Sequence, residues 1–310
     1  MNGGSIFLAS IAATLWGLSF IASAVALEAL SPPQLTALRF MIAACPALVV
    51  ARPPVAWTAL VTIGLTLFAG QFLLLFVALA MGLPPGLASV TQQTQVLFSV
   101  VLAAVFLGDT PRRQSVAGML IAFLGLGVIA LSVGRTGPIA ALAVGVTAAF
   151  SWAIGNVLIK RLGPVPMLPL VAWLSVIPPL PALAVSYFYP GPGLFTAIAT
   201  ARWSSLGAVL YLGLAATLVA YAIWGRLLTT YPTSMVAPFT LLVPVIGVAA
   251  AALLLDERFT ALRVCGMSLM LCGVAVAIIT PRTWNVDVDP HQNPEIERRT
   301  EREHEPRTVN

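Results

Sequence analysis

Long apolar segments alternate with short breaks rich in proline, glycine or charge along most of this chain. A helix needs roughly 20 apolar residues to cross a bilayer core of about 30 Å, and ten segments are suited to such a span. The predicted spans are 5 to 27, 33 to 50, 57 to 81, 86 to 107, 113 to 133, 138 to 159, 166 to 187, 205 to 228, 232 to 255 and 261 to 280. We expect an all-α polytopic membrane protein whose short connections join neighbouring helices as antiparallel hairpins.

One motif occurs twice: an apolar helix, a short acidic corner and a second apolar helix with a glycine near its start. The first copy reads LFSVVLAAVFLGDTPRRQSVAGML and the second reads PVIGVAAAALLLDERFTALRVCGM, so that Gly118 aligns with Gly266 at an offset of 148 residues. A looser match pairs AATLWGLSF around Trp16 with AAFSWAIGN around Trp152. Many transporters are built from two such apolar halves, which makes transport the leading hypothesis.

The placement of Lys and Arg predicts the orientation in the membrane. With both termini in the cytoplasm, seven basic residues near the span ends lie inside and four lie outside, and the four arginines of the C-terminal tail also lie inside. This excess satisfies the positive-inside rule. Because five helices per repeat is an odd number, the second copy enters from the opposite face. We expect two inverted five-helix repeats, over residues 5 to 133 and 138 to 280, with substrate bound near the midplane between them.

Composition and charge narrow the function classes. With 59% hydrophobic residues, 9% charged residues and a mean hydropathy of +0.96, the 310 residues offer too little polar surface to cover a soluble globule. The net charge of +5 comes from the membrane body, most of whose basic residues we assign to cytoplasmic loops. No basic stripe alternates with aromatic residues, so we expect no nucleic-acid partner. Residues 285 to 310 are acidic and lack an apolar period, which predicts a disordered cytoplasmic tail.

No Asp, Glu or His lies in the middle of any predicted span. A proton relay through a carboxylate or imidazole therefore has no candidate, and facilitated diffusion, or coupling without a protein carboxylate, fits better. The same pattern disfavours a membrane enzyme, because general acid–base catalysis and metal binding need such groups. The three cysteines, Cys45, Cys265 and Cys272, lie in apolar segments without a CxxC motif, and we interpret them as small core residues. We expect no cofactor.

The fourth predicted span is very polar for a membrane helix, reading SVTQQTQVLFS between Ser89 and Ser99. At 100° per residue, Thr91, Gln92 and Gln95 fall on one arc of the helix. An unpaired amide in hydrocarbon costs roughly 2 to 7 kcal/mol, so this stripe must face other helices or water. Two interpretations stay open, namely the lining of a cavity and hydrogen bonding between helices.

The ninth predicted span contains two prolines, Pro238 and Pro244, six residues apart in VAPFTLLVPV. Each removes the backbone donor to the carbonyl four residues earlier, which should free the carbonyls of Ser234 and Thr240. Such oxygens inside a membrane can bind a substrate ammonium group, although a packing kink is an equally good interpretation.

Aromatic residues and hydrogen-bonding groups share helix faces in three spans. The groups are Trp16, Ser19, Phe20 and Ser23; Trp152 and Asn156; and Thr217, Tyr221 and Trp224. Aromatic rings with donors attached, near the centre of a span, suit a small polar solute better than lipid contact. Anchoring at the membrane interface stays open for Trp224, which lies close to Arg226.

Arg39 is the only ionisable side chain well inside a predicted span. It lies six residues beyond Pro33, which is roughly 9 Å along a helix. A buried Arg costs about 2.5 to 3.5 kcal/mol on insertion scales, so we treat it as a candidate functional residue. It could bind a substrate carboxylate, or extend to the outer surface and pair with Glu28.

Several strings of the sequence resemble the EamA family of the drug/metabolite transporter superfamily: LWGLSF, ALRFMIAACPALVVARP, GLASVTQQTQVLFSVVLAAVFLGD, AAFSWAIGN, YAIWGRLL and VAPFTLLVPVIGVAAAALLLDER. The resemblance extends over residues 5 to 280 and implies ten transmembrane helices in two five-helix repeats. It also implies a bacterial inner-membrane exporter of cysteine, O-acetylserine or related amino acids. Asp109 departs from the family, which usually has Glu in a GER corner, whereas Glu257 keeps the acidic residue as DER.

Residue pattern and resemblance together predict export of a small zwitterion through a central cavity. The predicted substrate-binding residues are Trp16, Phe20, Arg39, Thr91, Gln92, Gln95, Trp152, Asn156, Tyr221, Pro238 and Pro244. Arg39 would bind the carboxylate, and the amides and proline-freed carbonyls would bind the ammonium. Besides this substrate and membrane lipids, a homodimer partner is left open. The alternatives are efflux of drugs or other metabolites, and a non-transporting membrane subunit.

Overall fold

The structure is a computed structural model that describes residues 1–278 apart from 109–112, 137–138, 164 and 232. The described residues form helices and connecting turns without a strand, which confirms the all-α prediction. The α-helices are α1 (Gly3–Leu27), α2 (Pro32–Ala44), α3 (Trp57–Ile63), α4 (Gln71–Ala80), α5 (Pro85–Thr91), α6 (Thr94–Leu107), α7 (Arg113–Thr136), α8 (Ile139–Leu162), α9 (Met167–Leu174), α10 (Pro179–Phe188), α11 (Leu194–Thr200), α12 (Trp203–Leu210), α13 (Ala220–Thr230), α14 (Thr233–Val236), α15 (Leu242–Leu254) and α16 (Ala261–Ile278). Two 3₁₀ turns, η1 (Cys45–Leu48) and η4 (Ala237–Leu241), and two π-helical segments, η2 (Gly64–Gly70) and η3 (Tyr211–Val219), lie between them.

Eight helical stretches of the described chain are long and apolar enough to cross a membrane. They are Gly3–Leu27, Trp57–Ala80, Pro85–Leu107, Arg113–Ser132, Ile139–Leu162, Met167–Phe188, Trp203–Thr230 and Ala237–Leu254. The other two predicted spans, 33 to 50 and 261 to 280, contain shorter helices. The α2 helix has only 13 residues because Pro46 lacks the backbone donor that would continue it, and η1 follows. The apolar part of α16 is Ala261–Ala277.

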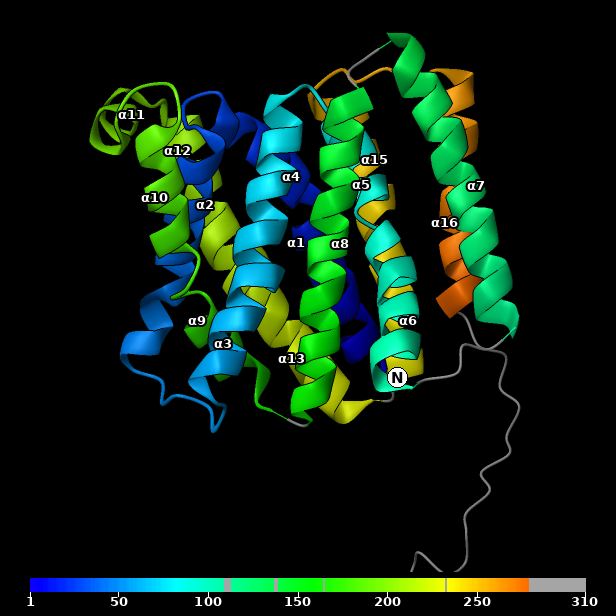
Figure 1. Cartoon of the computed structure of the whole chain (residues 1–310), viewed down its shortest axis with the longest axis horizontal. Coiled ribbons are helices and arrows are strands. Elements are labelled where there is room, and N and C mark those ends of the chain that lie inside the picture. Colours follow the sequence, from blue (N-terminus) through cyan, green and yellow to red (C-terminus); the bar gives the residue numbers. More distant parts are fainter. Residues whose placement is uncertain (109–112, 137–138, 164, 232, 279–310) are drawn as a thin grey trace, which may run out of the picture. The chain divides into compact units, whose positions relative to one another are not determined.

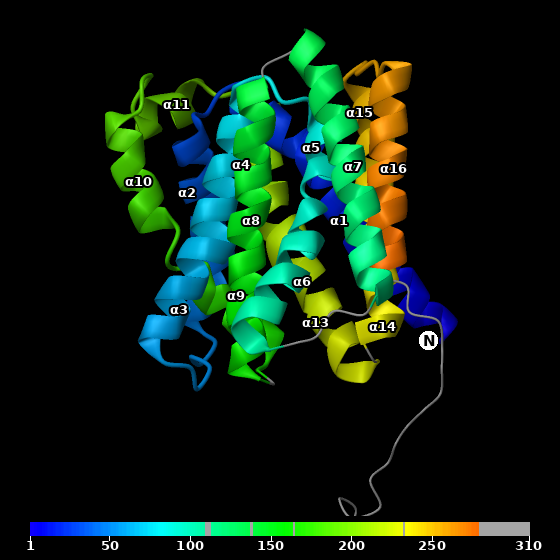
Figure 2. The same ribbon diagram turned by 45° about the vertical axis from the view of Figure 1, so that its right-hand side comes forward.

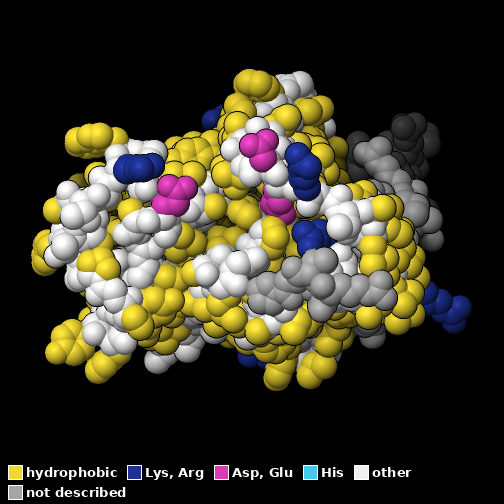
Figure 3. Space-filling view, turned by 90° about the horizontal axis from the view of Figure 1, so that it is seen from above, with side chains coloured by type: hydrophobic (Ala, Val, Ile, Leu, Met, Phe, Trp, Pro, Cys, Tyr) yellow, Lys and Arg dark blue, Asp and Glu magenta, His cyan; other side chains and the backbone are white. Residues whose placement is uncertain are grey.

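Helix α1 runs through the middle of the bundle and packs against α12, α13 and α15 (Figure 1). The α8 helix packs against α4 and α6, and α2 packs against α10. The N-terminus and the last described turn of α16 lie at the same end of the bundle (Figure 2). Figure 3 shows the other end, where basic and acidic side chains lie among a largely apolar surface. Large apolar side chains such as Leu124, Leu131 and Leu253 are exposed on the outside, as lipid contact requires.

The interruptions of the helices recur at the spacing of the sequence repeat. The π-helical segments η2 and η3 begin 147 residues apart, at Gly64 and Tyr211. A turn at Gln92–Gln93 separates α5 from α6, and 148 residues later the 3₁₀ turn η4 gives way to α15 at Leu241. A π-helical segment or a broken helix needs support from its neighbours, and both features are frequent at functional sites. The repeated motif therefore includes backbone irregularity as well as sequence.

The two glycine-containing motifs meet in an antiparallel pair, α7 and α16 (Figures 1 and 2). A Cβ atom at Gly118 would lie 2.6 Å from the Gly273 carbonyl oxygen, and one at Gly266 would lie 3.1 Å from the Gly125 carbonyl oxygen. No side chain fits between backbones this close, so small residues are required where these membrane helices cross. The alignment of Gly118 with Gly266 thus corresponds to two equivalent positions in one helix pair.

Candidate functional site

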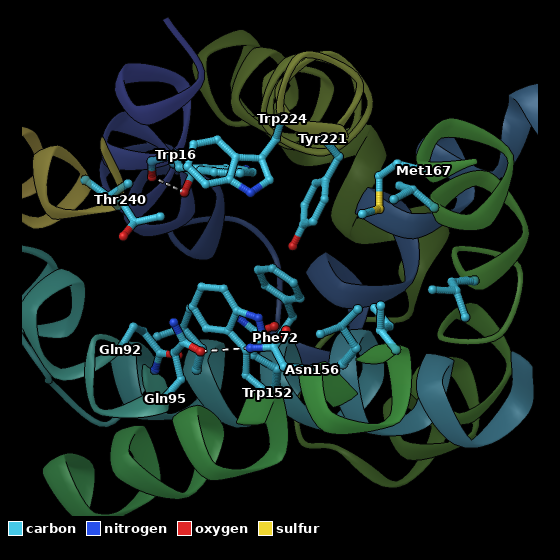
Figure 4. Close-up of a pocket in the computed structure, with 18 of the residues that line it drawn as sticks. Trp16, Phe72, Gln92, Gln95, Trp152, Asn156, Met167, Tyr221, Trp224 and Thr240 are labelled. Carbon is cyan, nitrogen blue, oxygen red and sulfur yellow. Dashed lines mark hydrogen bonds between the residues drawn. The ribbon is translucent and has the colours of Figure 1, made fainter. Parts of the chain in front are cut away.

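A cavity of about 300 Å³ lies inside the bundle (Figure 4). Its wall combines α1, α2, α4 and the α5–α6 turn with α8, α9, α13 and η4. Six aromatic side chains contribute to this wall: Trp16, Phe20, Phe72, Trp152, Tyr221 and Trp224. In Figure 4, Trp16, Tyr221 and Trp224 lie on one side of the open space, and Gln92, Trp152 and Asn156 lie on the other. The cavity is therefore enclosed by helices from both halves of the chain.

Eight of the eleven predicted substrate-binding residues line this cavity: Trp16, Phe20, Arg39, Gln92, Gln95, Trp152, Asn156 and Tyr221. The other three, Thr91, Pro238 and Pro244, lie outside the lining. Thr91 is fully buried, and its hydroxyl donates to the Leu87 carbonyl at 2.9 Å within its own helix. A single arc of an ideal helix does not describe this span, because the turn at Gln92–Gln93 changes the direction of the side chains.

The two prolines of the ninth span mark helix starts rather than kinks in a continuous helix. Pro238 lies in the 3₁₀ turn η4, and Pro244 lies in the first turn of α15. A first-turn residue has no intrahelical partner for its N–H, so proline is tolerated there. Two other residues of this span contribute to the cavity wall instead: Thr240, two residues after Pro238, and Val243, directly before Pro244.

Arg39 is buried in α2, with 2% of its surface exposed, and lines the cavity. Its Nε donates to the Thr217 hydroxyl at 3.1 Å, and its guanidinium carbon lies 3.9 Å from the centre of the Phe72 ring. Arg39 thus points into the bundle and does not extend to Glu28. Among the described residues no acidic side chain forms an ion pair with it, so a cation–π contact and one neutral hydrogen bond stabilise its charge.

The π-helical segment η3 explains why Thr217 can accept this hydrogen bond. The Thr217 hydroxyl donates to the Leu212 carbonyl, five residues earlier, at 2.8 Å. That spacing matches the wider π-helical turn, and it leaves the lone pairs of the same hydroxyl oxygen facing Arg39. The irregular backbone of the eighth span therefore positions the cation.

The polar stripe of the fourth span supplies both kinds of contact that were left open. The Gln95 side-chain oxygen accepts a hydrogen bond from Asn156 Nδ2 at 2.8 Å, drawn as a dashed line in Figure 4. Gln92 Nε2 donates to the Gly145 carbonyl at 3.0 Å. Both bonds join this span to α8, yet both glutamines also line the cavity. One stripe thus holds two helices together and faces the open space.

The aromatic residues form a contiguous group along one side of the cavity. Trp16 packs edge-on against Tyr221 and against Trp224, with ring centres 5.2 Å apart in each pair. Trp16 Nε1 donates to the Ala216 carbonyl at 3.0 Å. The hydroxyl of Tyr221 points into the open space (Figure 4). Trp224 belongs to the cavity wall.

The sequence reasoning missed other residues of the wall, notably Gln71, Phe72 and Gln93. Gln71 is the only carboxamide in the third predicted span, and that signal could have identified it. Gln93 lies off the predicted arc of the fourth span. The aliphatic part of the wall carried no usable signal, because an apolar residue in a membrane helix faces lipid, core or cavity with the same chemistry. It comprises Leu67, Leu75, Ile159, Met167, Leu170, Val171, Leu174, Leu228 and Val243.

The two ends of the bundle differ. A second hollow of about 630 Å³ shares Ile159, Met167, Leu170 and Leu228 with the first. It is lined by the end of α8 and the start of α9. These two parts of the chain lie toward the end of the bundle that carries the N-terminus (Figure 2). At the opposite end, the Glu257 carboxylate accepts a hydrogen bond from the Gly86 backbone N–H at 2.9 Å. This bond ties the α15–α16 connection to the start of α5.

Glu257 lies outside the membrane-length helices and is half-buried. Burial raises the pKa of its carboxyl group, while the Gly86 N–H and the positive charge of Arg263 act in the opposite direction. Within the described part of the chain, no group of three or more His, Cys, Asp or Glu side chains could hold a metal ion. Asp109, the counterpart of Glu257 in the repeat, lies outside the described residues.

Apolar helices of membrane length, repeated interruptions and a partly polar internal cavity together indicate a membrane transporter. The model of the EamA-like transporter family matches residues 3–131 and, a second time, residues 139–279. The chain belongs to the EamA-like transporter family. The resemblance found in its sequence is thereby confirmed, and the protein is a polytopic membrane protein of this family.

Individual relatives agree with this assignment. A "probable amino-acid metabolite efflux pump" of Salmonella typhimurium is 38% identical over 280 residues, covering 88% of this chain and 94% of that protein. A protein of the same name from Escherichia coli is 38% identical over 279 residues, with coverage of 87% and 93%. A solved crystal structure superposes with a TM-score of 0.63 at 21% identity, covering 89% of this chain and 97% of the other. That structural likeness shows a shared fold.

Proposed function

We propose that this EamA-like transporter exports small amino-acid metabolites, such as cysteine and O-acetylserine, across the bacterial inner membrane through the central cavity. The relatives that are 38% identical over most of their length carry names of this kind. The cavity of about 300 Å³ lies at the lower limit of typical small-molecule sites. It has room for a small amino acid together with part of its hydration.

Arg39 carries the proposal. It is a buried cation at the cavity wall, and no acidic side chain of the described chain pairs with it. Such a charge costs about 2.5 to 3.5 kcal/mol in a membrane helix on insertion scales. A substrate carboxylate would offset that cost through charge-assisted hydrogen bonds to the terminal guanidinium nitrogens. An amino acid provides this carboxylate in every case, whatever its side chain.

The proposal includes ten transmembrane helices arranged as two inverted repeats, over residues 5 to 133 and 138 to 280, with both termini in the cytoplasm. The recurrence of the helix interruptions at 147 and 148 residues supports the two repeats. The N-terminus and the end of α16 at one end of the bundle support an even number of crossings. Under this orientation the second hollow opens toward the cytoplasm, where an exporter collects its substrate.

The direct test is transport by purified protein in liposomes. Radiolabelled cysteine, O-acetylserine and a panel of other amino acids are followed with and without an imposed proton gradient. We expect saturable flux of at least one amino acid, and loss of that flux in Arg39→Gln. An absence of flux for every amino acid in the wild-type protein would overturn the proposal. A dependence on the gradient would overturn only the expectation of facilitated diffusion.

The second candidate function is efflux of drugs or other apolar metabolites. The six aromatic rings and the aliphatic part of the wall support it, because such surfaces bind apolar molecules of many shapes. Cells that express the transporter would then resist a panel of apolar toxic compounds, and Arg39→Gln would leave this resistance intact. Loss of resistance in the variant would favour carboxylate-containing substrates.

A further inference from the structure

Three side-chain amide oxygens at the cavity wall lack a hydrogen-bond donor within the described part of the chain. They belong to Gln71, Gln92 and Gln93, which are 2%, 1% and 4% exposed. All three residues line the cavity. Buried oxygens in folded proteins are nearly always satisfied by protein, water or a ligand. Three such oxygens around one cavity indicate a place where donors from outside the chain bind.

The orientation of one amide is fixed by its neighbour. Gln92 Nε2 donates to the Gly145 carbonyl at 3.0 Å, and a carbonyl can only accept, so the free atom of Gln92 must be the oxygen. Gln71 and Gln93 form no side-chain hydrogen bond with any described residue, so neither amide is held in place, and rotation of the side chain would turn its oxygen toward a ligand in the cavity. Gln95 differs, because its oxygen already accepts from Asn156 at 2.8 Å.

The interrupted helices bring these amides to the cavity. Gln71 directly follows the π-helical segment η2, at the first residue of α4. Gln92 and Gln93 form the turn between α5 and α6. Broken or distorted membrane helices are tolerated where they border a cavity, and transporters place ligand contacts at such points. The amides therefore lie at the two irregular points of the first half that face the cavity.

We infer that Gln71, Gln92 and Gln93 form the binding site for the ammonium group of the substrate, while Arg39 binds its carboxylate. This inference rests on the proposed function. An ammonium group has three N–H donors and no acceptor, and the three amide oxygens have no donor. No acidic side chain lines the described cavity wall, so neutral oxygens perform this recognition. They select amino acids over carboxylic acids of the same shape that lack the amine.

The test compares ligands that differ by one charged group. The probes are cysteine, 3-mercaptopropionate, which lacks the amine, and cysteamine, which lacks the carboxylate, together with the pair phenylalanine and 3-phenylpropionate. Each competes with the flux of whichever radiolabelled amino acid the wild-type protein transports in liposomes. In the wild-type protein we expect each amino acid to compete at least tenfold better than its analogue without the amine.

The variants Gln71→Met and Gln93→Met keep the side-chain length and remove the amide. In both variants we expect competition by the amino acids to weaken about tenfold and competition by the analogues without the amine to stay unchanged. The discrimination, which is the ratio of the two, should then fall toward one. The matched control is Gln34→Met. Gln34, in α2, is also a buried amide, but it donates to the Pro192 carbonyl at 2.8 Å and lies outside the cavity wall. This variant should keep the wild-type discrimination.

Thermal unfolding separates a binding role from a structural role, because the loss of a structural contact lowers the Tm of the ligand-free protein. Because Gln71 and Gln93 have no described protein partner, their Met variants should keep the Tm of the ligand-free protein, whereas Gln34→Met should lower it. If a Met variant does not fold, a Gln→Asn variant at the same position replaces it. Its shorter side chain keeps the amide but moves the oxygen away from the ligand, and the same competition assay applies. Unchanged discrimination in folded variants would overturn the ammonium site alone. A wild-type protein that moves no amino acid would instead overturn the proposed function.

Discussion

The fourth and ninth spans occupy equivalent places in the repeat, yet they contribute different chemistry to the cavity. At an offset of 148 residues, Gln92 corresponds to Thr240 and Gln95 corresponds to Val243, and all four residues line the wall. Both spans are interrupted at this point. The first half supplies carboxamides there, whereas the second half supplies one hydroxyl and an aliphatic side chain.

Most other polar residues of the wall also belong to the first half, with Asn156 of α8 as an exception. The buried cation and the free amide of the third span, Arg39 and Gln71, also belong to the first half. The second half contributes most of the aliphatic wall and two of the edge-packed aromatic rings, Tyr221 and Trp224. Duplication of a sequence motif thus accounts for the shared backbone geometry, and departures from the repeat account for the polarity. Under the proposed function, a zwitterionic substrate would lie with its charges toward the first half and its side chain toward the second.

The largest effect is expected from removing the cation of the first half. In Arg39→Gln, amino-acid transport should fall about 100-fold, since charge-assisted bonds are worth about 1.5 to 3 kcal/mol. Stability should be little changed, because the lone buried charge is costly. Initial rates in liposomes and Tm measure the two quantities. Arg52→Gln is the control, since Arg52 lies over Trp57 in a connection outside the cavity. An equal loss in both variants would contradict a specific role for Arg39.

The shared geometry of the halves can be tested at the π-helical segments. A Cβ atom at Gly64 would lie 2.8 Å from the Ile177 side chain, and one at Gly213 would lie 2.7 Å from the Ile42 side chain. Overpacking of this kind costs about 1 to 3 kcal/mol, so Gly64→Ala and Gly213→Ala should lower the Tm by similar amounts. Gly207→Ala has open space at its Cβ and should not lower it. A loss confined to one half would show that the two packings are not equivalent.

Gln92 should combine a binding role with a structural one. Its amide nitrogen satisfies the Gly145 carbonyl, and leaving a buried acceptor unsatisfied costs about 1 to 3 kcal/mol. Gln92→Met should therefore reduce both Tm and substrate affinity, whereas Thr240→Val, its counterpart in the second half, should change affinity little. Thermal unfolding and competition assays check both variants. If Thr240→Val matched the loss of affinity in Gln92→Met, the asymmetry of the two halves would not hold.

The smallest effect concerns pH. Because burial raises the folded-state pKa of Glu257 above its ordinary value of 4.5, this group stabilises the protein most below pH 4.5. That contribution to stability is lost as the pH rises through the raised pKa of the folded state. Glu257→Gln mimics the protonated group and should remove this part of the pH dependence of Tm while keeping the contact with Gly86. An unchanged profile would mean that another group titrates there.

Part of the cavity could be predicted from sequence for a simple reason. Polar and aromatic side chains such as Arg39, Gln95 and Trp152 are conspicuous in membrane helices, where hydrocarbon penalises them, so they must face the interior. That reasoning found eight wall residues. It did not find Gln93, because the turn at Gln92–Gln93 rotates this side chain away from its place on an ideal helix. It also placed Pro238 and Pro244 at the cavity, although both lie at helix starts.

The sequence by itself determined that this chain is a helical membrane protein, that a motif recurs at 148 residues and that the family is EamA. Hydropathy, helical length and string similarity are local properties, so no fold is needed to recognise them. Only the tertiary structure decided which amide oxygens remain without donors, that Arg39 lies over Phe72 rather than beside Glu28, and how the two ends of the bundle differ. Hydrogen-bond satisfaction depends on groups that are far apart in sequence, and packing alone brings them together.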